Sequence, residues 1–340
     1  MGPSGAEIIA IEYALPEKVV SNEDLHQLHP DWDMEEVYRK TGVRERRVAG
    51  DGECASDLAY GACRRLFDAH GVSPAEVDGL IVCTQSPDYI MPPTATLLQA
   101  RLGLPKSVAA FDYSLACSGY IYGLAMCKAF IESGLLKSIV LVCADTYSKY
   151  IRPEDRGPAT VFGDGASATW VRKGAPSIGE MALGTDGSGA GNFIVRGGGC
   201  RNGFDLRSKG EHSSPTDLRY IEMDGFGILS FVKKEIPPFV RKLLASAGLK
   251  LEDVDQYVFH QASRLALEQL ALFLRLPMDK VLINFENVGN LVSASIPIAL
   301  RDGWQAGKIR GGTTVLLAGF GVGLSWGGCV VRLTENFMKT

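Results

Sequence analysis

Apolar runs that end in small or polar residues recur along the chain and predict buried β-strands. The runs LIVC (residues 80–83), SIVLV (138–142) and YVF (257–259) consist largely of Val, Ile, Leu and aromatic residues, as in strands covered on both faces. Helical patterns such as YIYGLAMCKAF (120–130) lie between them. Strands that alternate with helices in this way predict an α/β fold with mostly parallel sheets.

The same features occur twice, which indicates an internal duplication. Asp78 follows Gly71 by seven residues and opens an apolar strand, and Asp255 stands in the same relation to Gly248. Matching features at a fixed spacing mark a repeat architecture. The pattern therefore predicts two related halves.

Further along, each half has a short predicted strand, then a turn of small residues, then a helix. The strand begins at Phe111 in the first half and at Phe285 in the second, and the turns hold Cys117 and Asn290 at matching positions. The pattern F-G-x-G-x-S then closes both halves, at residues 162–167 and 320–325.

Two halves, residues 1–174 and 175–340, are expected to pack about a pseudo-two-fold axis and to share helices between their sheets. Equivalent loops of the halves would then converge on one site. This arrangement predicts that Cys117, His260 and Asn290 lie together despite their separation in sequence.

Composition narrows the class of protein. The net charge of −4 over 340 residues argues against nucleic acid or an anionic membrane as the main partner. Residues 311–331 are uncharged and long enough to span a bilayer, at roughly 20 residues. Seven of them are glycine, so two strands joined by a GFGVG loop explain the stretch better than a helix. No targeting signal precedes the first strand, and we expect a cytoplasmic protein.

The eight cysteines form no C-x-x-C pairs, so neither a zinc site nor a disulfide framework is predicted. Cys117 differs from the others because it lies among small residues in SLACSGY, directly before a helical pattern. The amide end of a helix favours a thiolate. We predict that Cys117 is a nucleophile and that the other cysteines are small apolar residues.

His260 and Asn290 are the candidate partners of Cys117. His260 ends an apolar strand, where an imidazole can point into a cleft, and Asn290 follows a glycine at a turn. Taken alone, such a His is commonly a core or surface residue and such an Asn is commonly a helix cap. The repeat makes Asn290 the counterpart of Cys117, and the three residues together supply a nucleophile and two neutral hydrogen-bond donors.

The segment GFGVGLSWGG (residues 319–328) lies between two predicted strands, whereas a phosphate loop opens a helix. We expect the amides of Gly323 and Cys117 to form an oxyanion hole; a simple tight hairpin is the alternative. The basic run TGVRERR (41–47) and Arg156 fit either solvated surface or contact with coenzyme A phosphates or an acidic carrier protein.

Taken together, ACSGY, HQAS, NVGNLVSASIP, GFGVGLSWG, TGVRERR and EDRGPATVFGDGAS resemble the β-ketoacyl-acyl-carrier-protein synthase III family, in order and across nearly the whole chain. The resemblance implies a thiolase-like five-layered αβαβα sandwich and a homodimer without a metal or redox cofactor. It also implies Cys117 as the acylated residue and His260 with Asn290 as the decarboxylation pair.

The implied reaction is a decarboxylative condensation, in fatty acid initiation or a specialised ketide pathway. An acyl group from acyl-CoA or an acyl carrier protein passes to Cys117 and is attacked by the carbanion of a malonyl thioester. Substrate contacts are assigned to Met91, Arg44, Arg156, Phe226, Ser263 and Leu324. The resemblance places Met91 near the acyl pocket of the partner subunit.

The sequence departs from the family along the channel for coenzyme A. Glu36 stands where members that use acyl-CoA carry a Trp, and Trp32 lies further upstream. Ser263 turns the family's HQAN into HQAS, and Phe226 replaces another Asn. These departures favour a specialised pathway and a carrier-bound donor.

Three other functions fit parts of the pattern: acyl transfer from Cys117 to an alcohol or amine, an inactive subunit kept for dimerisation, and a cysteine hydrolase. Acyl transfer leaves Asn290 without a task, and an inactive subunit would not need the intact set of Cys117, His260 and Asn290. The surroundings of Cys117 match neither papain-like nor caspase-like hydrolases.

Overall fold

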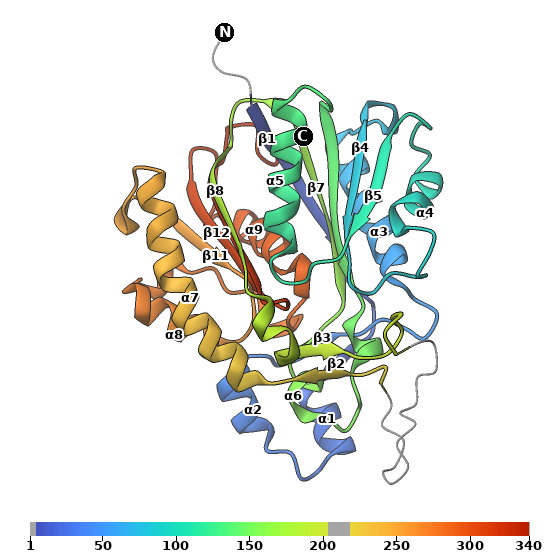
Figure 1. Cartoon of the computed structure of the whole chain (residues 1–340), viewed down its shortest axis with the longest axis vertical. Coiled ribbons are helices and arrows are strands. Elements are labelled where there is room, and N and C mark those ends of the chain that lie inside the picture. The colour runs from blue at the N-terminus through green and yellow to red at the C-terminus, as the bar shows by residue number, and fades with distance from the viewer. Residues whose placement is uncertain (1–4, 203–217, 340) are drawn as a thin grey trace.

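The computed structural model describes residues 5–202 and 218–339. Figure 1 shows two large β-sheets with helices between them and outside them. The strands are β1 (Gly5–Ala14), β2 (Val19–Ser21), β3 (Glu45–Arg47), β4 (Gly79–Cys83), β5 (Ala109–Tyr113), β6 (Ser138–Asp145), β7 (Gly165–Gly174), β8 (Ile178–Thr185), β9 (Phe193–Val195), β10 (Ile221–Met223), β11 (Gln256–Phe259), β12 (Thr314–Gly321) and β13 (Ser325–Arg332). The α-helices are α1 (Asn22–Leu28), α2 (Met34–Thr41), α3 (Ala55–His70), α4 (Thr94–Arg101), α5 (Gly119–Glu132), α6 (Arg156–Ala159), α7 (Gly225–Ser246), α8 (Arg264–Leu274) and α9 (Ser295–Gln305).

Both large sheets are mixed. The first has the order β1-β7-β6-β4-β5, and β4 pairs in parallel with β5 and β6 while β7 is antiparallel to both of its neighbours. The second has the order β11-β12-β13-β8, in which β11 and β12 are parallel and the other pairs antiparallel. The prediction of mostly parallel sheets is therefore wrong. β12 and β13 are joined by residues 322–324 alone, and so short a link can connect only antiparallel strands.

Helices form three layers around these sheets. α5 contacts strands of both sheets, including β6 and β12, and α9 contacts β1 and β11. α3 and α4 cover the outer face of the first sheet, and α7 and α8 cover the outer face of the second (Figure 1). The layers run helix, sheet, helix, sheet, helix, which confirms the predicted αβαβα sandwich.

Two hydrophobic cores hold the layers together. One runs from α3 through the first sheet to α5 and α9, and the other lies between the second sheet and the pair α7 and α8. Side chains such as Leu124 and Ile298, on the two central helices, are fully buried; each such residue contributes about 1.5–3 kcal/mol on removal from water. No helix in the described parts of the chain is both long and apolar enough to cross a membrane.

The features that repeat in the sequence fall on corresponding elements. Gly71 follows α3 and Gly248 lies just beyond α7, with φ of 63° and 70°, the left-handed conformation that ends many helices. The short strand predicted at Phe285 is wrong, because a 3₁₀ turn, Phe285–Asn287, occupies that place. The chain pairs with the first half there, since Glu286 O accepts from Arg44 N and Asn290 bridges to Phe162. The boundary between residues 174 and 175 lies in the link from β7 to β8 and stays a prediction.

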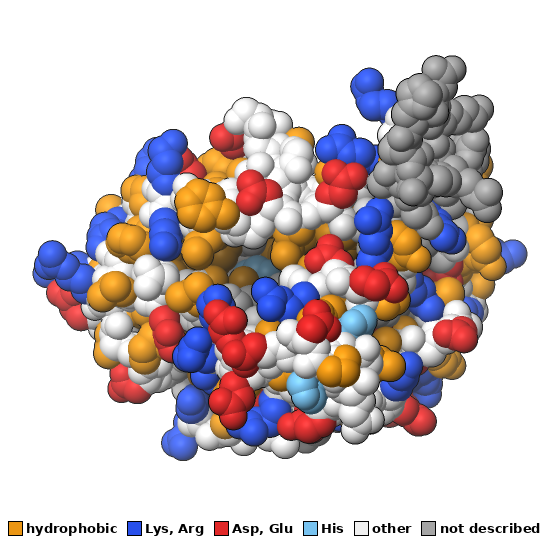
Figure 2. Space-filling model, turned by 90° about the horizontal axis from the view of Figure 1, so that it is seen from below, with side chains coloured by type: hydrophobic (Ala, Val, Ile, Leu, Met, Phe, Trp, Pro, Cys, Tyr) orange, Lys and Arg blue, Asp and Glu red, His pale blue; other side chains and the backbone are white. Residues whose placement is uncertain are grey.

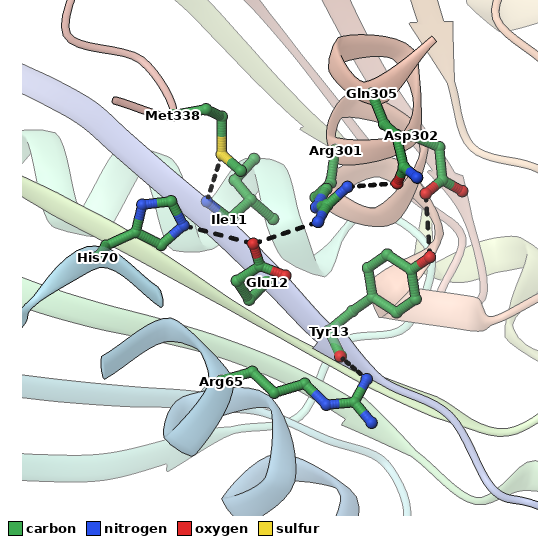
Figure 3. A network of polar contacts seen from close by, with 9 residues as sticks. All are labelled: Ile11, Glu12, Tyr13, Arg65, His70, Arg301, Asp302, Gln305 and Met338. Atoms are coloured by element: carbon green, nitrogen blue, oxygen red, sulfur yellow. Dashed lines mark hydrogen bonds and ion pairs between the residues drawn. The ribbon is translucent and has the colours of Figure 1, made fainter. Parts of the chain in front are cut away.

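A largely buried polar network fastens β1 to α3 and α9 (Figure 3). The carboxylate of Glu12 lies 3.3 Å from His70 Nε2 and accepts a hydrogen bond of 3.4 Å from Arg301 Nη2. Tyr13 donates to Asp302 Oδ1 over 3.1 Å. Burial alone would raise the pKa of Glu12, but the bond to His70 and the charge of Arg301 hold it below its ordinary value.

Candidate active site

Cys117 lies between β5 and α5, two residues before that helix begins. Its side chain is buried, and the last residue of β12, Gly321, packs directly against it. A Cβ on Gly321 would lie 3.0 Å from the Cys117 sulfur, closer than ordinary van der Waals contact. The end of β12 can approach the cysteine this closely only because residue 321 lacks a side chain.

Burial is the strongest influence on the Cys117 thiol and raises its pKa above the ordinary value, and the charge of Asp145 raises that pKa further. The backbone amides of Cys117 and Val322 act in the opposite direction and lower the thiol pKa. We expected the amide end of α5 to favour a thiolate, but desolvation outweighs it. The free thiol therefore stays protonated at neutral pH.

His260 is the residue after β11, and its backbone N–H donates to Ala318 of β12 over 2.8 Å. The imidazole is buried, with Nδ1 at 2.8 Å from Ser295 Oγ and the ring edge-to-face against Phe320. Burial lowers the pKa of His260 to about 3. The ring is therefore neutral at physiological pH and offers one donor and one acceptor nitrogen.

Asn290 is held by backbone pairing with the first half of the chain. Its N–H donates to Val161 O over 2.8 Å, and its carbonyl accepts from Gly163 N over 3.0 Å. The side-chain oxygen accepts the N–H of Val292 at 2.9 Å. The amide nitrogen Nδ2 is thereby directed to a point 3.4 Å from His260 Nε2.

The loops of the two halves cross at the site in a reciprocal way. The FGVG loop of the second half lies on the nucleophile turn at Cys117, and the FGDG loop of the first half lies on the turn at Asn290, where a Cβ on Gly163 would clash with Val288 O. Glycines in both loops permit the contacts. The convergence predicted from the repeat therefore has a local cause in the F-G-x-G sequence.

A cavity of about 250 Å³ connects the three side chains. Its lining, apart from Lys40 and Thr41 at the end of α2, is mostly apolar and includes Cys117, Tyr147, Phe162, Phe193, Met223, Ile228, Val232, His260, Ser263, Leu265, Asn290, Phe320, Gly321 and Val322. Figure 2 shows the corresponding face of the molecule, hollowed near its centre, with hydrophobic side chains around the hollow and charged ones on the rim. The rings of Tyr147, Phe162 and Phe193 pack against one another, with centroids 5.5–6.1 Å apart.

The six residues assigned to substrate contacts are dispersed. Ser263 caps α8 and lines the cavity. Phe226 is 83% exposed in the first turn of α7, beside the cavity residues Gly225 and Ile228. Leu324 is buried in the core of the second sheet. The other three are exposed and do not line the cavity: Arg44, which pairs with Glu286 at 3.2 Å, Arg156 at the start of α6, and Met91.

Two residues in the channel region have partners of their own. Trp32 is buried and stacks on His29, with ring centroids 4.0 Å apart. Glu36, on α2, forms an ion pair of 2.7 Å with Lys40. The indole of Trp32 is therefore engaged within the protein and does not line the cavity.

Sequence reasoning missed three groups at this site: the amide of Val322, the hydroxyl of Ser295 and the carboxyl of Asp145. Val322 stands one residue before the predicted Gly323, and only the path of the loop decides which amide faces the sulfur. Ser295 lies in the motif around Asn290, where the spacing of five residues was a usable signal. Asp145 ends β6, and burial raises its pKa to about 7.

In residues 5–202 and 218–339, no cluster of three or more His, Cys, Asp or Glu side chains is arranged to hold a metal ion. The residues that line the cavity include a thiol, an imidazole and a side-chain amide, from Cys117, His260 and Asn290. This set suits a reaction in which negative charge develops on a carbonyl oxygen.

Comparison with known families matches both halves of the chain. Residues 111–187 match the model of 3-oxoacyl-[acyl-carrier-protein (ACP)] synthase III, and residues 244–333 match the model of its C-terminal part. The β-ketoacyl-[acyl-carrier-protein] synthase III of Syntrophomonas wolfei is 35% identical over 96% of this chain and 97% of its own. Synthase III 3 of Streptomyces coelicolor is 37% identical, over 92% of each chain.

Solved structures agree with these relatives. A crystal structure of a 3-oxoacyl-(acyl-carrier-protein) synthase III is 42% identical and superposes with a TM-score of 0.92, covering 96% of this chain and 99% of the other. A priming β-ketosynthase from a polyketide biosynthetic pathway is 28% identical, with a TM-score of 0.87 and 97% of each chain covered.

Proposed function

Because the chain belongs to the β-ketoacyl-[acyl-carrier-protein] synthase III family of condensing enzymes, we propose that it acts as an acyltransferase with Cys117, His260 and Asn290 as its catalytic residues. The product is a β-ketoacyl thioester. The observation that carries the assignment is the shared cavity, in which Asn290 Nδ2 and His260 Nε2 lie 3.4 Å apart and Cys117 lines the same space.

In the first half-reaction the Cys117 sulfur attacks the carbonyl carbon of a donor thioester. A new C–S bond forms, the C–S bond of the donor breaks, and the thiol proton leaves with the donor thiol. The tetrahedral intermediate carries negative charge on oxygen, and the amides of Cys117 and Val322 are the proposed donors to it. Val322 is preferred to the predicted Gly323 because the Val322 amide, unlike that of Gly323, is among the groups that lower the pKa of the Cys117 thiol.

In the second half-reaction a malonyl thioester breaks the bond to its carboxylate and releases CO₂. The electron pair of that bond enters an enolate, whose oxygen accepts hydrogen bonds from His260 Nε2 and Asn290 Nδ2. The enolate carbon attacks the acyl carbonyl on Cys117, and the C–S bond breaks to release the Cys117 thiolate, which takes up a proton from water. No electron acceptor or metal enters this balance.

An acyl carrier protein is the proposed carrier of both thioesters. Trp32 stacks on His29 inside the protein, and Glu36, at the position of the family's Trp, pairs with Lys40. Neither offers a ring on which adenine could stack, so we rank carrier-bound donors above acyl-CoA. The exposed Phe226 beside the cavity adds an apolar contact for such a partner.

A homodimer is proposed through the free edge of the first sheet. β5 is an edge strand, and the loop between β4 and α4 exposes Tyr89, Ile90 and Met91 by 60%, 67% and 78%. Exposed edges and apolar patches of this kind are commonly covered by a partner. The implied position of Met91 at the partner's acyl pocket fits this edge.

The test is incubation of the protein with acyl-CoA and acyl carrier protein donors, followed by intact-mass measurement and peptide mapping. We expect an acyl adduct on Cys117 and none on a Cys117→Ala variant. Absence of an adduct from every donor would overturn the proposed nucleophile.

Asn290→Ala separates condensation from simple acyl transfer. We expect the variant to acylate Cys117 but to release CO₂ from the malonyl thioester about 100-fold more slowly, because one of the two enolate donors is gone. Unchanged CO₂ release would assign the site to transfer without decarboxylation.

A further inference from the structure

Ser295 stands directly behind the imidazole of His260. It is the first residue of α9, it is buried, and its Oγ lies 2.8 Å from His260 Nδ1. A hydroxyl at this place can either donate to Nδ1 or accept from it. The choice decides which ring nitrogen carries the hydrogen.

The backbone next to His260 favours one choice. The N–H of Gln261 points at Ser295 Oγ over 3.4 Å and takes up one of its lone pairs. Gln261 is itself fixed, because its side-chain amide donates to Phe259 O and Leu282 O and accepts from Asn284 N. In the described parts of the chain, His260 Nδ1 is also the one acceptor found for the Ser295 hydroxyl, so the hydroxyl hydrogen is directed to Nδ1.

On the opposite side of the ring, the side-chain amide of Asn290 faces the other ring nitrogen. Its Oδ1 is occupied by the N–H of Val292, so Nδ2 faces His260 Nε2. The 3.4 Å separation is long for an N–H···N bond, in which Nδ2 would donate to an Nε2 without hydrogen, and it allows the two nitrogens to share an acceptor between them. A ring with hydrogen on Nε2 gives two donors aimed at one oxygen.

We propose that Ser295 is a positioning residue that donates to His260 Nδ1 and thereby holds the hydrogen on Nε2, where it faces the enolate oxygen. This inference rests on the proposed function for the identity of that oxygen. The burial that lowers the pKa of His260 to about 3 keeps the ring neutral, so that only one nitrogen carries a hydrogen and its placement matters. The partner of the other ring nitrogen fixes such a tautomer, as in metal-bound histidines.

The tautomer can be measured without substrate. The chain has five histidines, so imidazole ¹H–¹⁵N correlation spectra are tractable, and His260→Gln assigns the signal. We expect the neutral Nε2–H form in the wild type and a mixed or reversed population in Ser295→Ala. A wild type with the hydrogen on Nδ1 would overturn the inference, whatever substrate the enzyme uses.

Ser293→Ala is the matched control. Ser293 is buried in the same segment, but its hydroxyl donates to Asp145 and not to His260. We expect this variant to keep the wild-type tautomer of His260. A tautomer change of equal size in Ser293→Ala and Ser295→Ala would mean that general loosening of the segment, not the Ser295 hydroxyl, is responsible.

Kinetics separate positioning from folding. In Ser295→Ala we expect the rate of malonyl decarboxylation to fall about tenfold while acylation of Cys117 stays within about twofold of wild type, and Ser295→Thr to restore most of the decarboxylation rate. Equal losses in both half-reactions, or no loss in either, would contradict the role. If the wild type does not decarboxylate malonyl thioesters at all, the proposed function is wrong. The role of Ser295 is still tested in that case, because the tautomer of His260 is measured without substrate.

Discussion

Burial determines the protonation of the two titratable catalytic residues. Removal from water raises the pKa of the Cys117 thiol and lowers that of His260 to about 3. Both groups are therefore neutral in the free enzyme. A site of this kind responds to charge that appears during the reaction, because its amide, imidazole and backbone donors are in place beforehand.

The neutral His260 makes stability depend on pH. The folded pKa of about 3 lies below the ordinary 6.5, so between these values the unfolded chain binds a proton that the folded chain does not. The contribution of the neutral His260 to the free energy of unfolding is complete above pH 6.5. It is lost as the pH falls, by at most about 1.4 kcal/mol per pH unit. In denaturant titrations from pH 7 to 4.5, His260→Gln should therefore gain stability relative to wild type as the pH falls. If the free energies of unfolding of the two proteins differed by the same amount at every pH, His260 could not be a buried neutral imidazole.

Asp145 has the opposite dependence. Burial raises its pKa to about 7, against hydrogen bonds from Ser293 and Gln85. The folded chain therefore binds a proton that the unfolded chain lacks between pH 3.8 and about 7, and stability is lost as the pH rises through that window. As the pH rises from 5 to 7.5, we expect the free energy of unfolding of Asp145→Asn to increase relative to that of wild type, measured by the same titrations. If the difference in free energy of unfolding between the variant and wild type did not rise with pH, the raised pKa of Asp145 would be contradicted.

At the scale of elements, glycine loops explain why distant segments meet. The sequence identified the repeat, the two F-G-x-G loops and the strands before Cys117 and His260, because periodicity and spacing carry that information. It did not identify the 3₁₀ turn at Phe285 or the amide of Val322, because the path of a loop is set by contacts with the other half of the chain. The thiol pKa was also out of reach, since burial depends on the completed fold.

Gly321→Ala tests the close approach of the β12 loop to the nucleophile. The new methyl group would lie 3.0 Å from the Cys117 sulfur, and we expect acylation of Cys117 to slow by at least about tenfold, since small displacements of reacting groups are costly. Gly50→Ala is the control, because no atom lies within 4 Å of its Cβ position. The readout is adduct formation by mass spectrometry in protein shown to be folded. Equal acylation rates in the two variants would contradict the tight packing.

At the scale of the molecule, the site exists only while the two halves keep their relative position, because each half supplies part of it. The network around Glu12 fastens β1 and α3 to α9 (Figure 3), and α9 begins at Ser295 behind His260. We expect Glu12→Gln to lower the free energy of unfolding by about 1–3 kcal/mol, because His70 and Arg301 lose a buried charged partner. Glu252→Gln, whose pair with Lys250 is 3.9 Å long and exposed, should change it by less than about 0.5 kcal/mol. If both variants changed the free energy of unfolding by similar amounts, the network around Glu12 would contribute no more to stability than an exposed ion pair.

The proposed dimer forms through the free edge of the first sheet, at β5. Ile90 is 67% exposed in the loop between β4 and α4, and Leu272 on α8 is 69% exposed on the second half, so the two residues make a matched pair for introducing a charge. If the edge forms the dimer, Ile90→Asp should shift sedimentation equilibrium toward monomer, because a carboxylate cannot be buried there without a partner. Leu272→Asp should leave the dimer intact. If Met91 also reaches the partner's pocket, the Ile90→Asp monomer should acylate Cys117 more slowly than wild type. A monomeric wild type, or a dimer that only Leu272→Asp dissociates, would place the interface elsewhere.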